Sequence, residues 1–249
     1  MPGIPIPAPD LTKAKRILAI QPHYDDIDIA AGGTLAALAT GGAEVFYLTV
    51  TDDLVGFIDQ SVPEAEMQKQ LRAEQRQAGE AVGVKDWFWL GYPDAGRFDH
   101  FELRRDIIGV IRQVRPDVVF TCDPWMPYEA HYDHVRTGFA AAEASTLYSF
   151  DRLAPESDTA YEPFDLMGVV FYATAFPNTV FDISATIELK NRALHAYLGQ
   201  FEPEDLERLV AVVTAAAEQY AADRPFQYGE PLKVLATYQL HVHPTTIHE

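Results

Sequence analysis

Short apolar runs alternate with stretches of helical periodicity along the first 150 residues of the chain. The runs are rich in β-branched and aromatic side chains, as buried strands are. The stretches between them show the apolar spacing of amphipathic helices. This alternation predicts a Rossmann-like, doubly wound α/β fold with a mostly parallel sheet. The predicted strands are 16–20, 44–50, 87–90 and 117–122; the predicted helices are 63–82, about 101–114, about 134–147, and one that follows a glycine-containing loop and ends at Gly41 and Gly42.

The C-terminal third has a less regular pattern. We expect it to add strands and covering helices to the same sheet, because no internal repeat or low-complexity linker separates it from the rest. The sequence thus predicts one domain over 1–249, with an extended arm at 1–14 and a tail at 241–249. The expected late elements are strand-like runs at 168–174, 178–184 and 231–240, one helix opened by Ser184 and another after Pro203.

Four irregular stretches are candidate loops around a ligand site. Ligands of open α/β sheets bind beyond the carboxyl ends of the strands, where such loops gather. The stretches are 52–63, 91–100, 123–133 and 150–166.

The charge balance of the chain is strongly acidic. A formal net charge of −18, from 37 acidic and 19 basic residues, would repel nucleic acid and anionic membranes. Small neutral or cationic substrates fit this charge better. No apolar stretch reaches the roughly 18 residues of a membrane span, and the first 16 residues are too polar and proline-rich for a signal peptide. We therefore expect a cytoplasmic protein that binds neither nucleic acid nor membranes and could form a homo-oligomer.

The single cysteine, Cys122, rules out a disulfide framework and a thiolate metal site within one chain. It lies at the end of a predicted buried strand and is most simply a small core residue. Any metal site would need nitrogen and oxygen ligands.

A first polar cluster comes directly after the first predicted strand. It contains His23, Asp25 and Asp26, with Tyr24 between them and Asp28 two residues further on. Three carboxylates so close together repel one another unless a cation or open solvent relieves them. A bound metal explains the cluster economically, although a solvated acidic turn is the more common meaning of such a short motif.

A second cluster follows the strand at 117–122. It ends in His131, Asp133 and His134, just before a predicted helix. By itself this segment would be a helix-capping loop, with Asp133 as the cap. Because both clusters follow strands of one parallel sheet, we expect them at the same edge.

Catalytic zinc takes three protein ligands and leaves a fourth position for water. The two clusters can supply two imidazoles and one carboxylate, with a second carboxylate left to act as a base. The spacing alone leaves the assignment open between Asp25 and Asp26, and between His131 and His134.

The order of these motifs resembles the PIG-L/LmbE-like family of metal-dependent N-acetylglucosaminyl deacetylases. The family's His-Pro-Asp-Asp and Gly-Gly-Thr-Leu segments are similar to HYDDIDIAAGGTL at 23–35, and its His-Pro-Asp-His segment is similar to HYDH at 131–134. The segments LRAEQRQAGEAVGV at 71–84 and LGYPDAGRF at 90–98 are similar to intermediate family segments.

This resemblance implies a zinc-dependent amide hydrolase acting on an N-acyl amino sugar; another divalent metal is an alternative. It implies that His23, Asp26 and His134 bind the metal and that Asp25 is the general base. His131 would orient Asp25 or stabilise the oxyanion. For substrate contacts the resemblance implies Arg72 and, less directly, Asp94 and Arg97; Trp125, in the second site loop, could stack on a sugar ring.

Several positions depart from the family pattern. Tyr24 and Tyr132 replace prolines, Ile27 replaces an acidic residue, and Tyr197 stands at the position of a late histidine. These changes leave the metal-binding set intact but alter the residues around it. The sugar and the acyl group therefore stay open.

Other functions fit the sequence less well. A non-catalytic metal- or sugar-binding protein is an alternative, although retention of Asp25 favours an enzyme. A phosphoesterase would need more basic residues to hold phosphate, and Gly32–Gly33 lacks the spacing of a dinucleotide-binding loop. The histidines at 241, 243 and 248 are expected in a terminal tail, with His241 closest to the cleft.

Overall fold

The computed structural model describes residues 7–153 and 162–241. Seven strands form a sheet in the order β3-β2-β1-β4-β5-β7-β6. The first five strands in this order are parallel to one another, whereas β7 runs antiparallel to both β5 and β6. This confirms the predicted mostly parallel sheet with extra C-terminal strands. The strands are β1 (Arg16–Gln21), β2 (Glu44–Thr51), β3 (Val84–Tyr92), β4 (Val118–Cys122), β5 (Gly168–Tyr172), β6 (Thr179–Asp182) and β7 (Gly229–Ala236).

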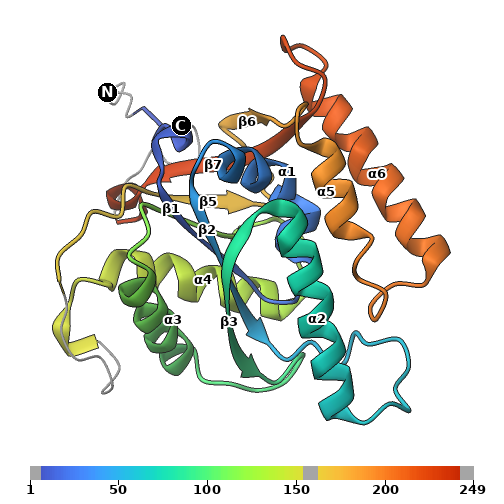
Figure 1. Ribbon diagram of the computed structural model, residues 1–249. Helices are drawn as coiled ribbons and strands as arrows, with labels where there is room; N and C mark the ends of the chain where they lie inside the picture. The colour runs from blue at the N-terminus through green and yellow to red at the C-terminus, as the bar shows by residue number, and fades with distance from the viewer. Residues whose placement is uncertain (1–6, 154–161, 242–249) are drawn as a thin grey trace.

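Helices cover both faces of this sheet (Figure 1). Alternate residues of β1 enter two separate cores: Ile17 and Ala19 pack on the side of α1 and α2, and Leu18 and Ile20 on the side of α3 and α4. Near-continuous apolar strands are what burial on both faces requires. The helices are α1 (Asp26–Thr40), α2 (Glu64–Val82), α3 (His100–Val114), α4 (Tyr132–Leu147), α5 (Ile187–Leu194) and α6 (Pro203–Ala221), with short 3₁₀ turns η1 (Leu11–Lys13), η2 (Asp151–Leu153) and η3 (Thr237–Leu240).

The start of α1 differs from the prediction. Instead of a loop that leads into a later helix, α1 begins at Asp26, directly after the first polar cluster. The Gln21 side chain at the end of β1 accepts a hydrogen bond from the Ile27 N–H at 2.9 Å, which satisfies one free donor of the first turn. Gly33 lies inside the helix, and a Cβ at this position would come within 2.8 Å of the Ile183 side chain. The glycine thus permits close packing.

The N-terminal arm also differs in part from the prediction. Residues 11–13 form η1, in which Leu11 is buried and the Asp10 side chain accepts from the Thr12 N–H. The histidines at 243 and 248 lie outside the described residues. Within the described parts of the chain, no helix is long and apolar enough to cross a bilayer.

The sheet places the two polar clusters side by side. Strand β1 pairs with β2 on one side and with β4 on the other, so the strand order changes direction at β1. The carboxyl ends of β1 and β4 lie side by side at this switch point, and the connections that follow them lead to helices on opposite faces of the sheet. Open α/β sheets bind ligands at such points.

Candidate metal centre

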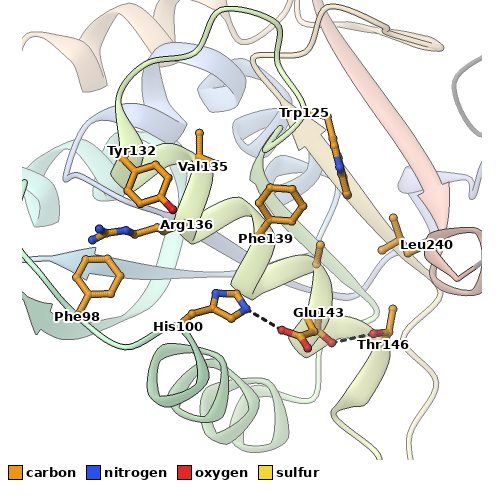
Figure 2. Close-up of a pocket in the computed structure, with 11 residues that line it drawn as sticks. Phe98, His100, Trp125, Tyr132, Val135, Arg136, Phe139, Glu143, Thr146 and Leu240 are labelled. Carbon is orange, nitrogen blue, oxygen red and sulfur yellow. Dashed lines mark hydrogen bonds and ion pairs between the residues drawn. The ribbon is translucent and has the colours of Figure 1, made fainter.

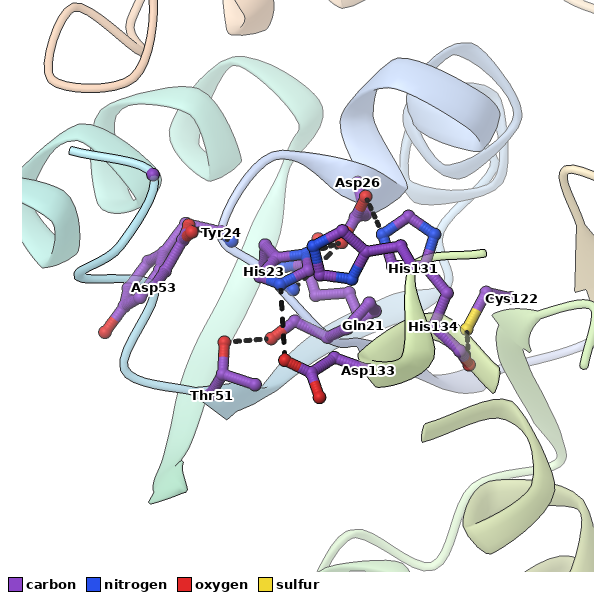
Figure 3. Close-up of polar contacts among 12 residues, drawn as sticks. Gln21, His23, Tyr24, Asp26, Thr51, Asp53, Cys122, His131, Asp133 and His134 are labelled. Atoms are coloured by element: carbon purple, nitrogen blue, oxygen red, sulfur yellow. Dashed lines mark hydrogen bonds and ion pairs between the residues drawn. The ribbon is translucent and has the colours of Figure 1, made fainter. Parts of the chain in front are cut away.

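The histidines of the two clusters meet at this edge of the sheet. His23 comes from the segment between β1 and α1, whereas His131 and His134 come from the start of α4. The ring centroid of His23 lies 4.6 Å from that of His131 and 5.3 Å from that of His134. Figure 3 shows the three rings gathered between Asp26 and Asp133. The local fold thus brings together side chains from positions more than a hundred residues apart.

Asp26 contacts the other two side chains of the predicted metal-binding set. Its Oδ2 lies 3.1 Å from Nδ1 of His23, and its Oδ1 lies 3.3 Å from Nε2 of His134. Oδ2 also accepts the backbone N–H of His23 at 2.9 Å. These three side chains therefore converge with two imidazole nitrogens turned toward one carboxylate, which is the donor set that zinc takes in hydrolases.

The geometry also allows other donor groupings. Nitrogens of His23, His131 and His134 all lie within 4.8 Å of one another, and so do donor atoms of His23, Asp94 and Asp133. His131 therefore has the position of a ligand as well as that of a group beside the metal. The convergence supports a metal centre without by itself separating these sets.

Asp25 is held in a crowded, acidic position. Its side chain is buried, and this burial, together with the charge of Asp26, raises its pKa to about 7. The neighbouring Asp53 is also buried, which raises its pKa well above the usual value, with a further contribution from Asp25. A bound cation would relieve the repulsion among these carboxylates.

His23 carries the opposite charge to this cluster. Burial acts to lower its pKa, but contacts with Asp26 and Asp94 overcome that effect and raise it to about 11. In the protein without metal the imidazolium of His23 therefore stands among the carboxylates as the local cation. A divalent ion would take over that role, so the residues present fit a metal.

Glu129 is a member of the site that the sequence analysis missed. Its Oε2 lies 3.1 Å from Nδ1 of His134, and its Oε1 accepts the backbone N–H of His131 at 2.6 Å. Carboxylates behind a metal-binding histidine fix the tautomer and the ring orientation. The only signal in the sequence is an acidic residue five positions before His134, in the second site loop.

The backbone N–H and carbonyl group of Tyr24 are held by residues of three other segments. Its carbonyl oxygen accepts from Nε2 of Gln75 at 3.0 Å and from the Tyr197 hydroxyl at 2.9 Å, and its N–H donates to Oδ2 of Asp53 at 3.0 Å. Asp53 has a positive φ of 58°, a backbone strain that occurs often at functional sites. Tyr24 lies between His23 and Asp25 in the chain, so these contacts set the positions of both.

The predicted substrate contacts fall in different surroundings. Asp94 is 9 % exposed; its Oδ1 lies 3.3 Å from Nε2 of His23, and its Oδ2 accepts the N–H groups of Val55 and Gly56. Asp94 thus contacts both His23 and a loop, and its role as a substrate contact stays a prediction. Arg97, three residues further along, is exposed.

Arg72 and Trp125 contact different aromatic neighbours. The guanidinium of Arg72 lies 5.0 Å from the centre of the Trp89 ring. Burial raises the pKa of the Tyr24 hydroxyl, and Arg72 partly offsets this effect. Trp125 is 52 % exposed and packs edge-on against Phe139 and Phe171. Trp125 therefore leaves a large aromatic surface open to a ligand.

The motifs and the geometry agree with a known family model. Residues 18–145 match the model of PIG-L, described as GlcNAc-PI de-N-acetylase. The chain belongs to the PIG-L family. The matched segment contains both polar clusters and the strands that position them, so this membership covers the candidate centre itself.

Relatives of known activity agree with this assignment. The chain is 35% identical to a diacetylchitobiose deacetylase of Thermococcus kodakarensis, over 92% of this chain and 86% of that protein. It is 31% identical to a 1D-myo-inositol 2-acetamido-2-deoxy-alpha-D-glucopyranoside deacetylase of Catenulispora acidiphila, over 72% of this chain and 61% of that protein. These relatives are deacetylases of N-acetylated amino sugars, according to their names.

Solved structures show the same fold. The N,N'-diacetylchitobiose deacetylase from Pyrococcus horikoshii superposes with a TM-score of 0.87 at 32% identity, covering 96% of this chain and 90% of that one. The protein TT1542 from Thermus thermophilus superposes with a TM-score of 0.72 at 27% identity, covering 87% of this chain and 92% of that one. The late strands and helices therefore belong to the shared fold as well.

Proposed function

We propose that this chain is a zinc-dependent amide hydrolase that removes the acyl group from an N-acyl amino sugar. The observation that carries the proposal is the convergence of His23 and His134 on the carboxylate of Asp26, beside a buried Asp25. Family membership and the named deacetylases among the relatives support the same reaction class.

His23, Asp26 and His134 would hold the metal. Their nitrogen and oxygen donors, in a chain whose single cysteine is buried, suit zinc better than a thiolate-seeking metal. When bound, the ion supplies a Lewis acid that polarises the amide carbonyl and lowers the pKa of water.

Asp25 would carry the proton during the reaction. As a carboxylate it accepts a proton from the attacking water, and as a carboxylic acid it gives that proton to the nitrogen of the departing amine. Its pKa of about 7 without metal lies near neutral pH, where such a group exchanges protons most effectively. A nearby cation lowers that pKa and keeps Asp25 in its basic form at the start of the cycle.

Three further groups would assist. His131, whose ring packs against that of His23, would donate a hydrogen bond to the oxyanion of the tetrahedral intermediate. Glu129 orients His134, and the Tyr24 peptide spaces His23 from Asp25. Arg72, Asp94, Arg97 and Trp125 are proposed as contacts to the sugar.

The direct test is to measure bound metal in the purified protein and to screen N-acyl amino sugars for release of a primary amine. We expect about one zinc ion per chain and amine release that a chelator abolishes and zinc restores. A protein that binds no metal, or that stays inactive toward every amino sugar after zinc addition, would overturn the proposal.

A further inference from the structure

Two buried polar atoms beside the metal centre have no hydrogen-bond partner among the described residues. They are the hydroxyl oxygen of Tyr24 and Nε of Arg72. The Tyr24 side chain is fully buried, and a polar group left unpaired in such a place costs about 1–3 kcal/mol. The proposed reaction makes no use of this hydroxyl. Its presence therefore points to a role toward its neighbours.

Arg72 offers that hydroxyl a cation that is not neutralised elsewhere. Its guanidinium forms no ion pair with a described residue, although the chain has 37 acidic residues. Burial raises the pKa of the Tyr24 hydroxyl, and the nearby charge of Arg72 acts against this effect. The guanidinium carbon also lies 5.0 Å from the centre of the Trp89 ring. A guanidinium held over a ring keeps the N–H groups at its edge available for a ligand.

Trp89 is itself tied to the backbone of the metal centre. Its Nε1 donates to Oε1 of Gln75 at 2.7 Å, and Nε2 of Gln75 donates to the Tyr24 carbonyl oxygen at 3.0 Å. Arg72 and Gln75 are three positions apart on α2 and so share one side of the helix. Tyr24 thus meets this group of side chains twice, through its carbonyl at Gln75 and through its hydroxyl at Arg72.

We propose that Tyr24 is a positioning residue for Arg72. The buried hydroxyl and the Trp89 ring hold the guanidinium between them, with its free N–H groups directed at hydroxyl groups of the bound sugar. This inference rests on the proposed function, in which Arg72 contacts the sugar. A proline, which the family resemblance leads us to expect at position 24, could not supply this contact.

The position of Tyr24 in the chain gives this contact a consequence for the reaction. The residue that holds Arg72 also lies between His23 and Asp25. The group that recognises the sugar is therefore kept at a fixed distance from the groups that would hydrolyse it. Loss of the hydroxyl should affect how well the sugar is held more than how fast the bound sugar reacts.

Tyr24→Phe tests the proposal, because it removes one hydroxyl and keeps the buried ring and the backbone contacts. The substrate is the N-acyl amino sugar that the parent enzyme turns over fastest, with diacetylchitobiose as the first choice. We expect KM to rise by about 10-fold while kcat stays within about 2-fold and the zinc content is unchanged. Tyr148→Phe, which removes a hydroxyl that donates to the Phe164 carbonyl, is the matched control and should leave KM unchanged.

A double-mutant cycle shows whether the hydroxyl acts through Arg72. Arg72→Ala should raise KM at least as much, and Tyr24→Phe added to it should cause no further rise. Arg76→Ala is the control, because Arg76 also lies 5.0 Å from the Trp89 ring centre, one turn further along α2. It should leave KM and the effect of Tyr24→Phe unchanged. Additive rises in KM would overturn the proposal, and so would a fall in kcat or zinc content with unchanged KM, the result of a purely structural role.

The hold on the guanidinium can also be observed without turnover. Hydrogen exchange of the Arg72 Nε–H group, measured by NMR and assigned by its loss in Arg72→Lys, should be at least about 10-fold faster in Tyr24→Phe. Equal exchange in the two proteins would overturn the proposal. Failure of the proposed function has a different signature, since the parent enzyme would then release no amine from any sugar, whatever the exchange at Arg72.

Discussion

The two ring nitrogens of His134 face two different carboxylates. Nδ1 lies 3.1 Å from Oε2 of Glu129, and Nε2 lies 3.3 Å from Oδ1 of Asp26. Glu129 thus fixes the ring from behind and leaves Nε2 directed at the proposed metal position. This arrangement is a carboxylate–histidine pair of the kind that supports catalytic metals.

Glu129→Gln should weaken metal binding while leaving the fold intact. The amide cannot stabilise the Nδ1–H of His134 as a carboxylate does, so we expect the zinc affinity to fall by about 10- to 100-fold. Competition with a chromogenic chelator measures this change. Glu102→Gln, at an exposed position of α3, is the control and should bind zinc normally. Unchanged affinity in Glu129→Gln would remove Glu129 from the metal centre.

Asp25→Asn should separate chemistry from metal binding. The amide cannot accept the proton of the attacking water, so kcat should fall by about 10²- to 10⁴-fold, while the bound zinc stays near one ion per chain. His134→Ala should lose the metal instead. Metal analysis and amine release on the same samples distinguish the two variants. If Asp25→Asn loses its zinc, Asp25 is a ligand and the roles of the two adjacent carboxylates must be exchanged.

Metal binding should release protons at neutral pH. The contacts of His23 raise its pKa to about 11, so its extra proton stabilises the metal-free fold below about pH 6.5 and that contribution is lost as the pH rises toward 11. A metal-bound imidazole must be neutral, so zinc displaces this proton. Calorimetry at pH 7 in two buffers of different ionisation enthalpy should report at least about one proton per zinc ion, and affinity should rise with pH. His195→Ala, at an exposed histidine, should give the same count. A release near zero would contradict this picture.

Tyr197→Phe should destabilise the protein without removing the metal. The Tyr197 hydroxyl contacts both the Tyr24 carbonyl and the buried carboxylate of Asp28. Loss of this partner should lower the free energy of unfolding by about 1–3 kcal/mol, which denaturant titration measures. Turnover should also fall, because the Tyr24 peptide sets the spacing of His23 and Asp25. Tyr220→Phe on α6 should have no effect, and an equally small effect of Tyr197→Phe would show that Gln75 and Asp53 suffice to hold the peptide.

Gly138→Ala should disturb the metal centre from outside it. A Cβ at this position of α4 would lie 2.5 Å from the Cys122 carbonyl oxygen, so the helix must move away from the end of β4. We expect a loss of about 1–3 kcal/mol in stability and weaker zinc binding. Gly32→Ala is the matched control, because its Cβ would meet its neighbours at 3.6 Å, an ordinary contact. Thermal unfolding and chelator competition compare the two, and equal behaviour would show that α4 is free to shift.

Local sequence patterns were sufficient to predict the strands that carry the site. The runs before His23 and before the second cluster are apolar on both faces, and they form β1 and β4 as expected. The glycines after the first cluster were misleading because they resemble a loop. In the structure they lie inside α1, where Gly33 is required by the contact with Ile183, a residue 150 positions away.

The candidate centre also depends on contacts between residues that are far apart in the sequence. Spacing placed two clusters at one sheet edge but could not separate Asp25 from Asp26, because that choice depends on where α1 begins. The helix begins at Asp26, whose carboxylate contacts His23 and His134, and Asp25 is left buried beside Asp53. Glu129 was missed because its role depends on a loop conformation that no local pattern records.

Helix α4 carries two sets of side chains on two sides. His134 points toward Asp26, whereas Arg136, Phe139 and Glu143 line a cavity on the outward face of the helix (Figure 2). Exchange of the outward residues leaves in place the groups proposed to carry out the hydrolysis. Along this helix the outward surface can therefore diverge, by natural drift or by directed evolution, while the reaction itself is inherited unchanged.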